Sequence, residues 1–138
     1  MNLDWIYSMV IEKLDLSTVK GPSPELAAAV AIALGWRKKG CVWLEPNGDS
    51  RCLIWTSADG DDRHRFVWRP DLDDSPAIQL RETEVALTEP QWGRYTEALE
   101  KHVCHKHGTY DYWIILRFLR QAPAWLCCRE LVRAVRSA

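Results

Sequence analysis

The chain has 138 residues, of which 47% are hydrophobic and 27% charged, and its formal net charge is −1. This size and composition predict a single domain, residues 1–138, that buries about two thirds of its unfolded surface. We expect no membrane contact, because no apolar run reaches the ~18 residues of a membrane span and the N-terminal residues lack a signal-peptide pattern. Five cysteines without paired spacing indicate reduced thiols and a cytoplasmic protein.

Charge is distributed unevenly along the chain. Residues 45–100 contain six basic and thirteen acidic residues, whereas residues 101–138 contain seven basic and two acidic ones. An acidic segment beside a basic one indicates either two electrostatic faces or mutual neutralisation within the fold. The eight tryptophans also allow two interpretations, as core residues or as exposed anchors for a partner.

The first third of the chain predicts two helices. Apolar residues at helical spacing predict an amphipathic helix over residues 3–14, with an inward stripe of Leu3, Ile6, Tyr7, Val10, Ile11 and Leu14. A second helix begins after Ser23, a good N-cap residue followed by Pro24, and ends at Gly35, which can adopt the left-handed conformation of a helix C-terminus. Its alanine-rich sequence favours close packing against a sheet.

The next segment predicts an antiparallel sheet. Asn47-Gly48 between two β-rich runs, residues 41–44 and 51–55, is a strong hairpin signal. Residues 64–68 are expected to form a third strand, after an acidic turn at residues 59–62. Residues 77–87 alternate weakly and are interpreted, in part, as a fourth strand at the sheet edge.

Three helices are predicted after the sheet. Thr88 and Gln91 match a capping box at the start of a helix that runs to about His102, followed by a break over residues 104–108. A second helix is expected to end near residue 121, and a third follows Pro123 with the stripe Trp125, Cys128, Val132 and Val135. The sequence therefore predicts an α+β fold, a three- to four-stranded antiparallel sheet packed with about five helices.

Two acidic loops are candidate partner-binding segments. They lack the ligand pattern of a calcium loop and could be solvated turns, but they could also present carboxylates to a basic protein surface. Their residues are Asp59, Asp61, Asp62, Asp71, Asp73 and Asp74.

The C-terminal arginines form an alternative site for nucleic acid. Phosphate contacts require clustered basic side chains, and a solvated helix face explains the same pattern. The residues are Arg117, Arg120, Arg129, Arg133 and Arg136.

A cluster of His and Cys is a candidate zinc site. Its residues are His102, Cys104, His105 and His107, and Cys127-Cys128 could complete the set. The spacing matches no standard zinc motif, and a polar helix end explains the same residues. No nucleophile elbow, phosphate-binding loop or dinucleotide-binding glycine pattern occurs, so we expect a protein that is not an enzyme and needs no cofactor.

The run PELAAAVAIALGW followed by W-x-x-P-N-G resembles the phage ABA sandwich type of small phage and prophage protein. A late Cys-Arg pair followed by apolar residues, here residues 128–132, is also similar. The likeness covers residues 23–56 and 122–136. It implies α–β–α layering and a mobile-element setting in a bacterial host cell, and it supplies no functional residues.

The leading hypothesis is a non-catalytic phage or prophage accessory protein that binds a host protein or a protein–nucleic acid complex. Inhibition of a host defence system, as by an anti-CRISPR protein, is the specific role expected. The alternatives are nucleic-acid binding through the arginine helices and zinc binding at the His/Cys cluster. The sequence leaves the oligomeric state open.

Overall fold

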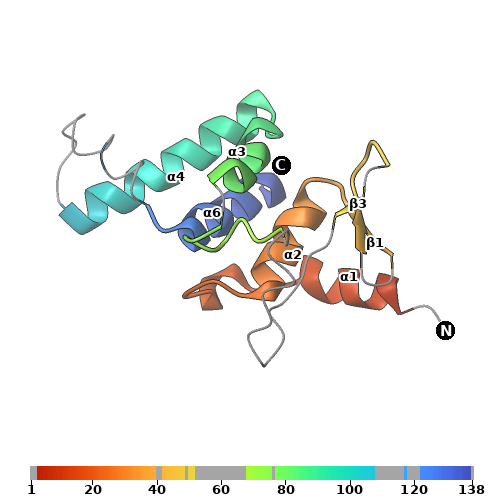
Figure 1. Cartoon of the computed structure of the whole chain (residues 1–138). Helices are drawn as coiled ribbons and strands as arrows, with labels where there is room; N and C mark the ends of the chain where they lie inside the picture. Colours follow the sequence, from red (N-terminus) through yellow and green to blue (C-terminus); the bar gives the residue numbers. More distant parts are fainter. Residues whose placement is uncertain are drawn as a thin grey trace.

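The computed structural model describes residues 3–39, 42–48, 50–51, 68–75, 77–107, 117 and 122–137. Mixed helix and antiparallel sheet are confirmed. In Figure 1 the small sheet lies beside α1 at one end of the molecule, while α4 extends toward the other end. The elements in chain order are α1 (Asp4–Glu12), a 3-10 helix (Leu16–Thr18), α2 (Pro24–Ala33), β1 (Arg37–Lys39), β2 (Val42–Leu44), β3 (Ser50–Arg51), α3 (Ala77–Val85), α4 (Glu89–His107) and α6 (Ala124–Arg136).

Helix α2 forms as predicted and is the centre of the core. The Ser23 hydroxyl accepts the Leu26 N–H at 3.1 Å, and Gly35 has a φ of 84°. The Trp36 N–H donates to the Ala31 carbonyl and the Gly35 N–H to the Ile32 carbonyl, so these two hydrogen bonds form a Schellman motif. Six consecutive residues, 26–31, are buried, because the small side chains let α6 and α1 pack against α2. The main neighbours of α2 are therefore helices, not the sheet that its composition suggested.

The sheet has the order β1-β2-β3, and both strand pairs are antiparallel. The predicted hairpin is present: Leu44 pairs with Ser50, and the Gly48 N–H donates to the Glu45 carbonyl in the turn. Only β2 and β3 of these three strands belong to runs that the sequence predicted as strands, so two of the predicted strands form within the described residues. Strand β1 was not predicted, and the register of Lys38 with Trp43 shows that the basic run at residues 37–39 pairs with β2.

The predicted edge strand within residues 77–87 is wrong, because Ala77–Val85 is helix α3. Helix α4 begins as predicted: the Thr88 N–H donates to Gln91 Oε1 at 2.8 Å, and the Gln91 N–H is 3.4 Å from Thr88 Oγ1. It continues to His107, so the break predicted from residue 104 is also wrong.

Helix α6 follows Pro123 as predicted and packs against α2, α4 and α3. Cys128 and Val132 are buried, while Trp125 and Val135 are half-buried. The expected third strand lies outside the described residues except for Trp68, which is not in a strand. Of the helix expected before residue 121, only Arg117 is described, and its backbone is helical.

Candidate functional site

The acidic residue Asp71 is part of the internal framework. Its carboxylate receives Nε and Nη2 of Arg69, both at 2.9 Å, and the Ser23 N–H at 2.8 Å. The Asp71 side chain has no exposed surface. It therefore joins the segment 68–75 to the first turn of α2, and the prediction that it lies on a partner-binding surface is corrected by its burial.

Asp73 has a related role at the start of α6. Its Oδ1 accepts the Ala124 N–H at 2.8 Å, and the N-cap residue Pro123 offers no side-chain acceptor of its own. A carboxylate at this end of a helix satisfies an unpaired N–H and complements the helix dipole. Asp74 is exposed, whereas residues 59, 61 and 62 of the other acidic loop lie outside the described residues.

Three of the arginines proposed for nucleic acid are bonded within the chain. Glu130, which is only 5% exposed, receives Arg129 Nε at 3.1 Å and Arg133 Nη1 at 2.8 Å. Arg129 Nη1 also donates to the Val19 carbonyl at 3.1 Å. Arg136 donates to the carbonyls at the end of α1, from Nη1 to Leu14 at 2.6 Å and from Nη2 to Ile11 at 2.9 Å. These contacts attach α6 to α1 and to the connector before α2.

Arg129, Arg133 and Arg136 thus have a structural role within the chain that the sequence did not reveal. A cation at the C-terminal end of α1 is favourable because the last carbonyls of a helix carry partial negative charge. Arg117 is exposed, and Arg120 lies outside the described residues.

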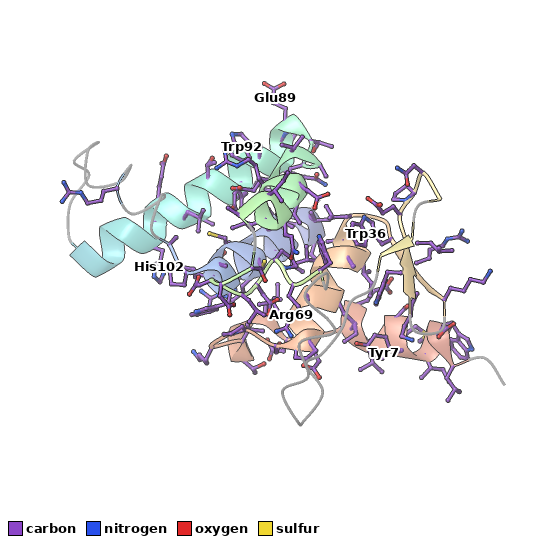
Figure 2. All side chains as sticks on the ribbon, viewed as in Figure 1. Tyr7, Trp36, Arg69, Glu89, Trp92 and His102 are labelled. Carbon is purple, nitrogen blue, oxygen red and sulfur yellow. The ribbon has the colours of Figure 1, made fainter. Side chains whose placement is uncertain are left out.

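The candidate zinc residues lie in the last turns of α4. The helical backbone places positions 102 and 105 on one face and positions 104 and 107 on nearly the opposite face. His102 is half-buried and is labelled in Figure 2. Among the described residues no group of three or more His, Cys, Asp or Glu side chains could hold a metal ion. The side chains at 104, 105 and 107 lie outside the description, so zinc binding there stays a prediction.

Cys127 and Cys128 of α6 are free thiols, and both are buried. Burial raises the pKa of Cys127 to about 11, and burial also raises the pKa of Cys128 well above its usual range. Burial likewise raises the pKa of Tyr95, whose hydroxyl donates to Glu84 Oε2 at 2.9 Å. In the metal-free chain both thiols are therefore protonated near neutral pH, the form that is a poor nucleophile.

Helix α3 buries two polar residues and exposes two apolar ones, while Leu80 is half-buried against the core. Gln79 and Thr83 are buried, and Gln79 Oε1 accepts the Arg69 N–H at 2.7 Å. On the other side Ile78 is 67% exposed and Val85 is 79% exposed. Ile78 and Val85 are seven positions apart in the sequence, so they lie on one side of the helix.

Trp92 is a further exposed apolar residue, in the first turns of α4. It is 45% exposed, and its ring centroid lies 5.6 Å from that of Tyr95. Figure 2 shows Glu89 projecting from the first turn of α4 and Trp92 close beyond it, at the end of the helix that joins α3. We name Ile78, Val85 and Trp92 the α3–α4 face.

The surroundings of the α3–α4 face are acidic. Residues 77–100 contain five Glu and two Arg. Of these, Glu89, Glu97 and Glu100 are exposed, and Glu97 pairs with Lys101 at 3.1 Å. Arg81 is also exposed, on the same side of α3 as Ile78 and Val85, so the border is acidic on balance and not throughout. An apolar patch with an acidic border is suited to a partner with an apolar patch and a basic border.

A second apolar surface lies on α1. Of the predicted inward stripe only Ile11 is buried, with Leu14 half-buried; the rest of the stripe is exposed. The exposed fractions are 61% for Trp5, 40% for Ile6, 43% for Met9, 63% for Val10 and 55% for Leu3. We name these five side chains the α1 face. Trp5 and Met9 lie off the predicted stripe, and this nearly continuous apolar circumference was the signal that one side of α1 would stay uncovered.

The tryptophans divide between the two interpretations. Trp36, Trp43 and Trp68 are buried, and the rings of Trp36 and Trp68 have centroids 4.5 Å apart. Trp5 and Trp92 are exposed, one on each of the two apolar faces.

Comparisons with protein-family models, curated proteins and solved structures find no match for this chain. Among the described residues, no helix is both long and apolar enough to cross a membrane.

Proposed function

We propose that this protein acts by binding another protein through the α3–α4 face. The observation that supports this proposal is the orientation of α3, which exposes Ile78 and Val85 while it buries Gln79 and Thr83, together with the exposure of Trp92 on α4. Tryptophan is enriched among the residues that dominate binding energy at interfaces. The acidic border selects a partner whose complementary patch has a basic rim.

The orientation of α3 is fixed before any partner binds. The hydrogen bond from the Arg69 N–H to Gln79 and the one from Tyr95 to Glu84 hold opposite ends of the helix. A preorganised face loses little conformational entropy on association, so a small apolar patch suffices for measurable affinity. Replacement of Trp92 by Ala is expected to weaken binding by about 30-fold, equivalent to ~2 kcal/mol.

The biological setting belongs to the same proposal. A phage or prophage accessory protein in the cytoplasm of a bacterial host would meet basic nucleic-acid-processing complexes, and inhibition of a host defence system is the specific role that we propose. The resemblance of residues 23–56 and 122–136 to small phage proteins supports this setting.

The binding test compares matched variants on the two apolar faces. Immobilised wild-type chain, Val85→Glu and Met9→Glu are exposed to lysate of a bacterial host, and the retained protein is identified, purified and titrated by calorimetry. We expect Val85→Glu to lose the partner and Met9→Glu to retain it. We also expect affinity to fall as salt concentration rises, because the basic rim faces acidic residues. Equal retention by both variants, or nothing above background, would refute the proposal.

The biological role has a separate test. Phage plating is measured on a host with an active CRISPR system that expresses the wild-type chain or Val85→Glu. Protection of the phage by the wild-type chain alone supports the role of a defence inhibitor. Unchanged plating would refute the role of a defence inhibitor. Calorimetry tests the binding proposal independently of this result.

A further inference from the structure

The outward side of α1 has a symmetric arrangement of apolar residues. Ile6 and Met9 occupy its middle, with Trp5 on one flank and Val10 on the other. The midpoint between Ile6 and Met9 is the same as the midpoint between Trp5 and Val10, and it lies between Tyr7 and Ser8.

We propose that two copies of this chain associate through their α1 faces, antiparallel, about a two-fold axis at this midpoint. In that arrangement Ile6 stands at the level of the partner's Met9, and Trp5 at the level of the partner's Val10. A two-fold axis brings the same surface of each copy together, so each copy contributes the same apolar side chains to the interface. This inference is independent of the function proposed for the α3–α4 face.

The α1 face cannot turn inward, because contacts on the other side of α1 fix the helix. Ile11 is buried in the core, and the ring of Tyr7 meets Trp43 edge-on at 6.4 Å between centroids. Lys38 Nζ pairs with Asp4 at 3.3 Å at the first turn. Arg136 holds the carbonyls at the last turn.

The exposed area matches a small dimer interface. From the exposed fractions, the five side chains leave on the order of 500 Å² per copy, as much as the largest apolar patch on a typical monomer. Complete burial of these side chains in two copies would remove at most about 1,000 Å², which is near the lower bound for a specific interface. We therefore expect a reversible dimer with a dissociation constant in the micromolar range.

The charges on α1 favour a second copy over a lipid surface. The helix and its last cap residue carry Asp4, Glu12 and Lys13, whereas helices that lie on anionic membranes have a strongly basic polar face. In the antiparallel pair Glu12 lies near the N-terminal end of the partner helix, where the helix dipole stabilises a carboxylate.

The test is sedimentation velocity of the full chain over a series of concentrations. We expect the mass to rise from 16.0 kDa toward twice that value as concentration increases. Ile6→Lys and Met9→Glu are each expected to weaken the dimer at least 100-fold, while Val85→Glu, the matched control on the α3–α4 face, leaves it unchanged. Circular dichroism and tryptophan emission check folding, and Val10→Glu replaces any variant that does not fold.

Mixing the two variants tests the register. An equimolar mixture of Ile6→Lys and Met9→Glu places opposite charges at the same level of the interface, so we expect heterodimers in the mixture. A wild-type chain that remains monomeric at several hundred micromolar would overturn the proposal. A dimer that is lost in Val85→Glu but not in Ile6→Lys, or binding of the monomer to neutral lipid vesicles through α1, would overturn it as well.

Discussion

Replacement of Asp71 by Ala removes the contact that joins segment 68–75 to α2. Two groups lose their partner: the Arg69 guanidinium, whose side chain is 11% exposed, and the Ser23 N–H. An ion left unpaired in a largely buried site costs about 3 kcal/mol, at the lower end of the observed range because part of Arg69 reaches solvent. The orphaned N–H adds about 1 kcal/mol.

The expected loss for Asp71→Ala is therefore about 4 kcal/mol of the free energy of unfolding, or a shift of about 2 M in the urea midpoint for a protein of this size. Urea unfolding followed by tryptophan fluorescence measures it, because Trp36 and Trp68 are buried near this contact. Asp74→Ala is the control, since Asp74 is exposed and its removal should change stability by less than ~0.5 kcal/mol.

A double-mutant cycle with Arg69→Met separates the ion pair from the rest. The double variant should be less destabilised than Asp71→Ala alone, because methionine leaves no unpaired charge behind. If Asp71→Ala stays within 1 kcal/mol of Asp74→Ala, or if the cycle shows no coupling, the role assigned to this contact is wrong.

Three further predictions concern single positions and are checked by urea unfolding. Gly35→Ala should cost ~1–2 kcal/mol because φ is 84°, whereas Gly21→Ala should cost less than half as much. Asp73→Ala should cost about 1 kcal/mol, since the first N–H of α6 loses its acceptor. Because burial raises the pKa of Cys127 in the folded chain, the unfolded chain loses the thiol proton at a lower pH. The free energy of unfolding should therefore fall as pH rises from about 9 to about 11, and Cys127→Ser should reduce that fall.

The elements that the sequence predicted correctly are those whose signals are local. Ser23, Pro24 and Gly35 act within a few residues of the helix that they delimit, and the Asn47-Gly48 turn determines its own hairpin. The capping box at Thr88 is likewise a contact between neighbours in sequence. Such signals survive in any tertiary context, so they can be interpreted without knowledge of the fold.

The elements that were missed depend on contacts between distant residues. The buried carboxylate of Asp71 accepts an N–H from residue 23, and Arg136 caps a helix that ends more than 120 residues earlier. Both residues belong to sets that composition suggested were exposed, because charge runs are usually solvated. Nothing in the sequence pairs these residues with their backbone partners, so their structural roles could not be predicted.

Helix α3 shows why the candidate surfaces were missed as well. Its alternation suggested a strand, and its orientation contradicts the rule that apolar residues face the core. Two polar contacts, one from the segment at Arg69 and one from Tyr95 on α4, hold that orientation together with the packing of Leu80 against the core. A sequence pattern cannot identify such a helix, because hydrogen bonds help to determine which side is buried.

The two apolar faces lie on elements that the fold already holds by other means. Polar contacts at α3 and the Arg136 cap at α1 fix each helix, so its outward side is not required for folding stability. Replacement of Val85 or Ile6 should therefore change binding while the free energy of unfolding of the monomer stays nearly constant. If α1 pairs two copies, each dimer carries two α3–α4 faces, and a partner with repeated sites would bind it with higher avidity than the monomer. The Ile6→Lys variant would lose that gain while its intrinsic affinity per chain stays the same.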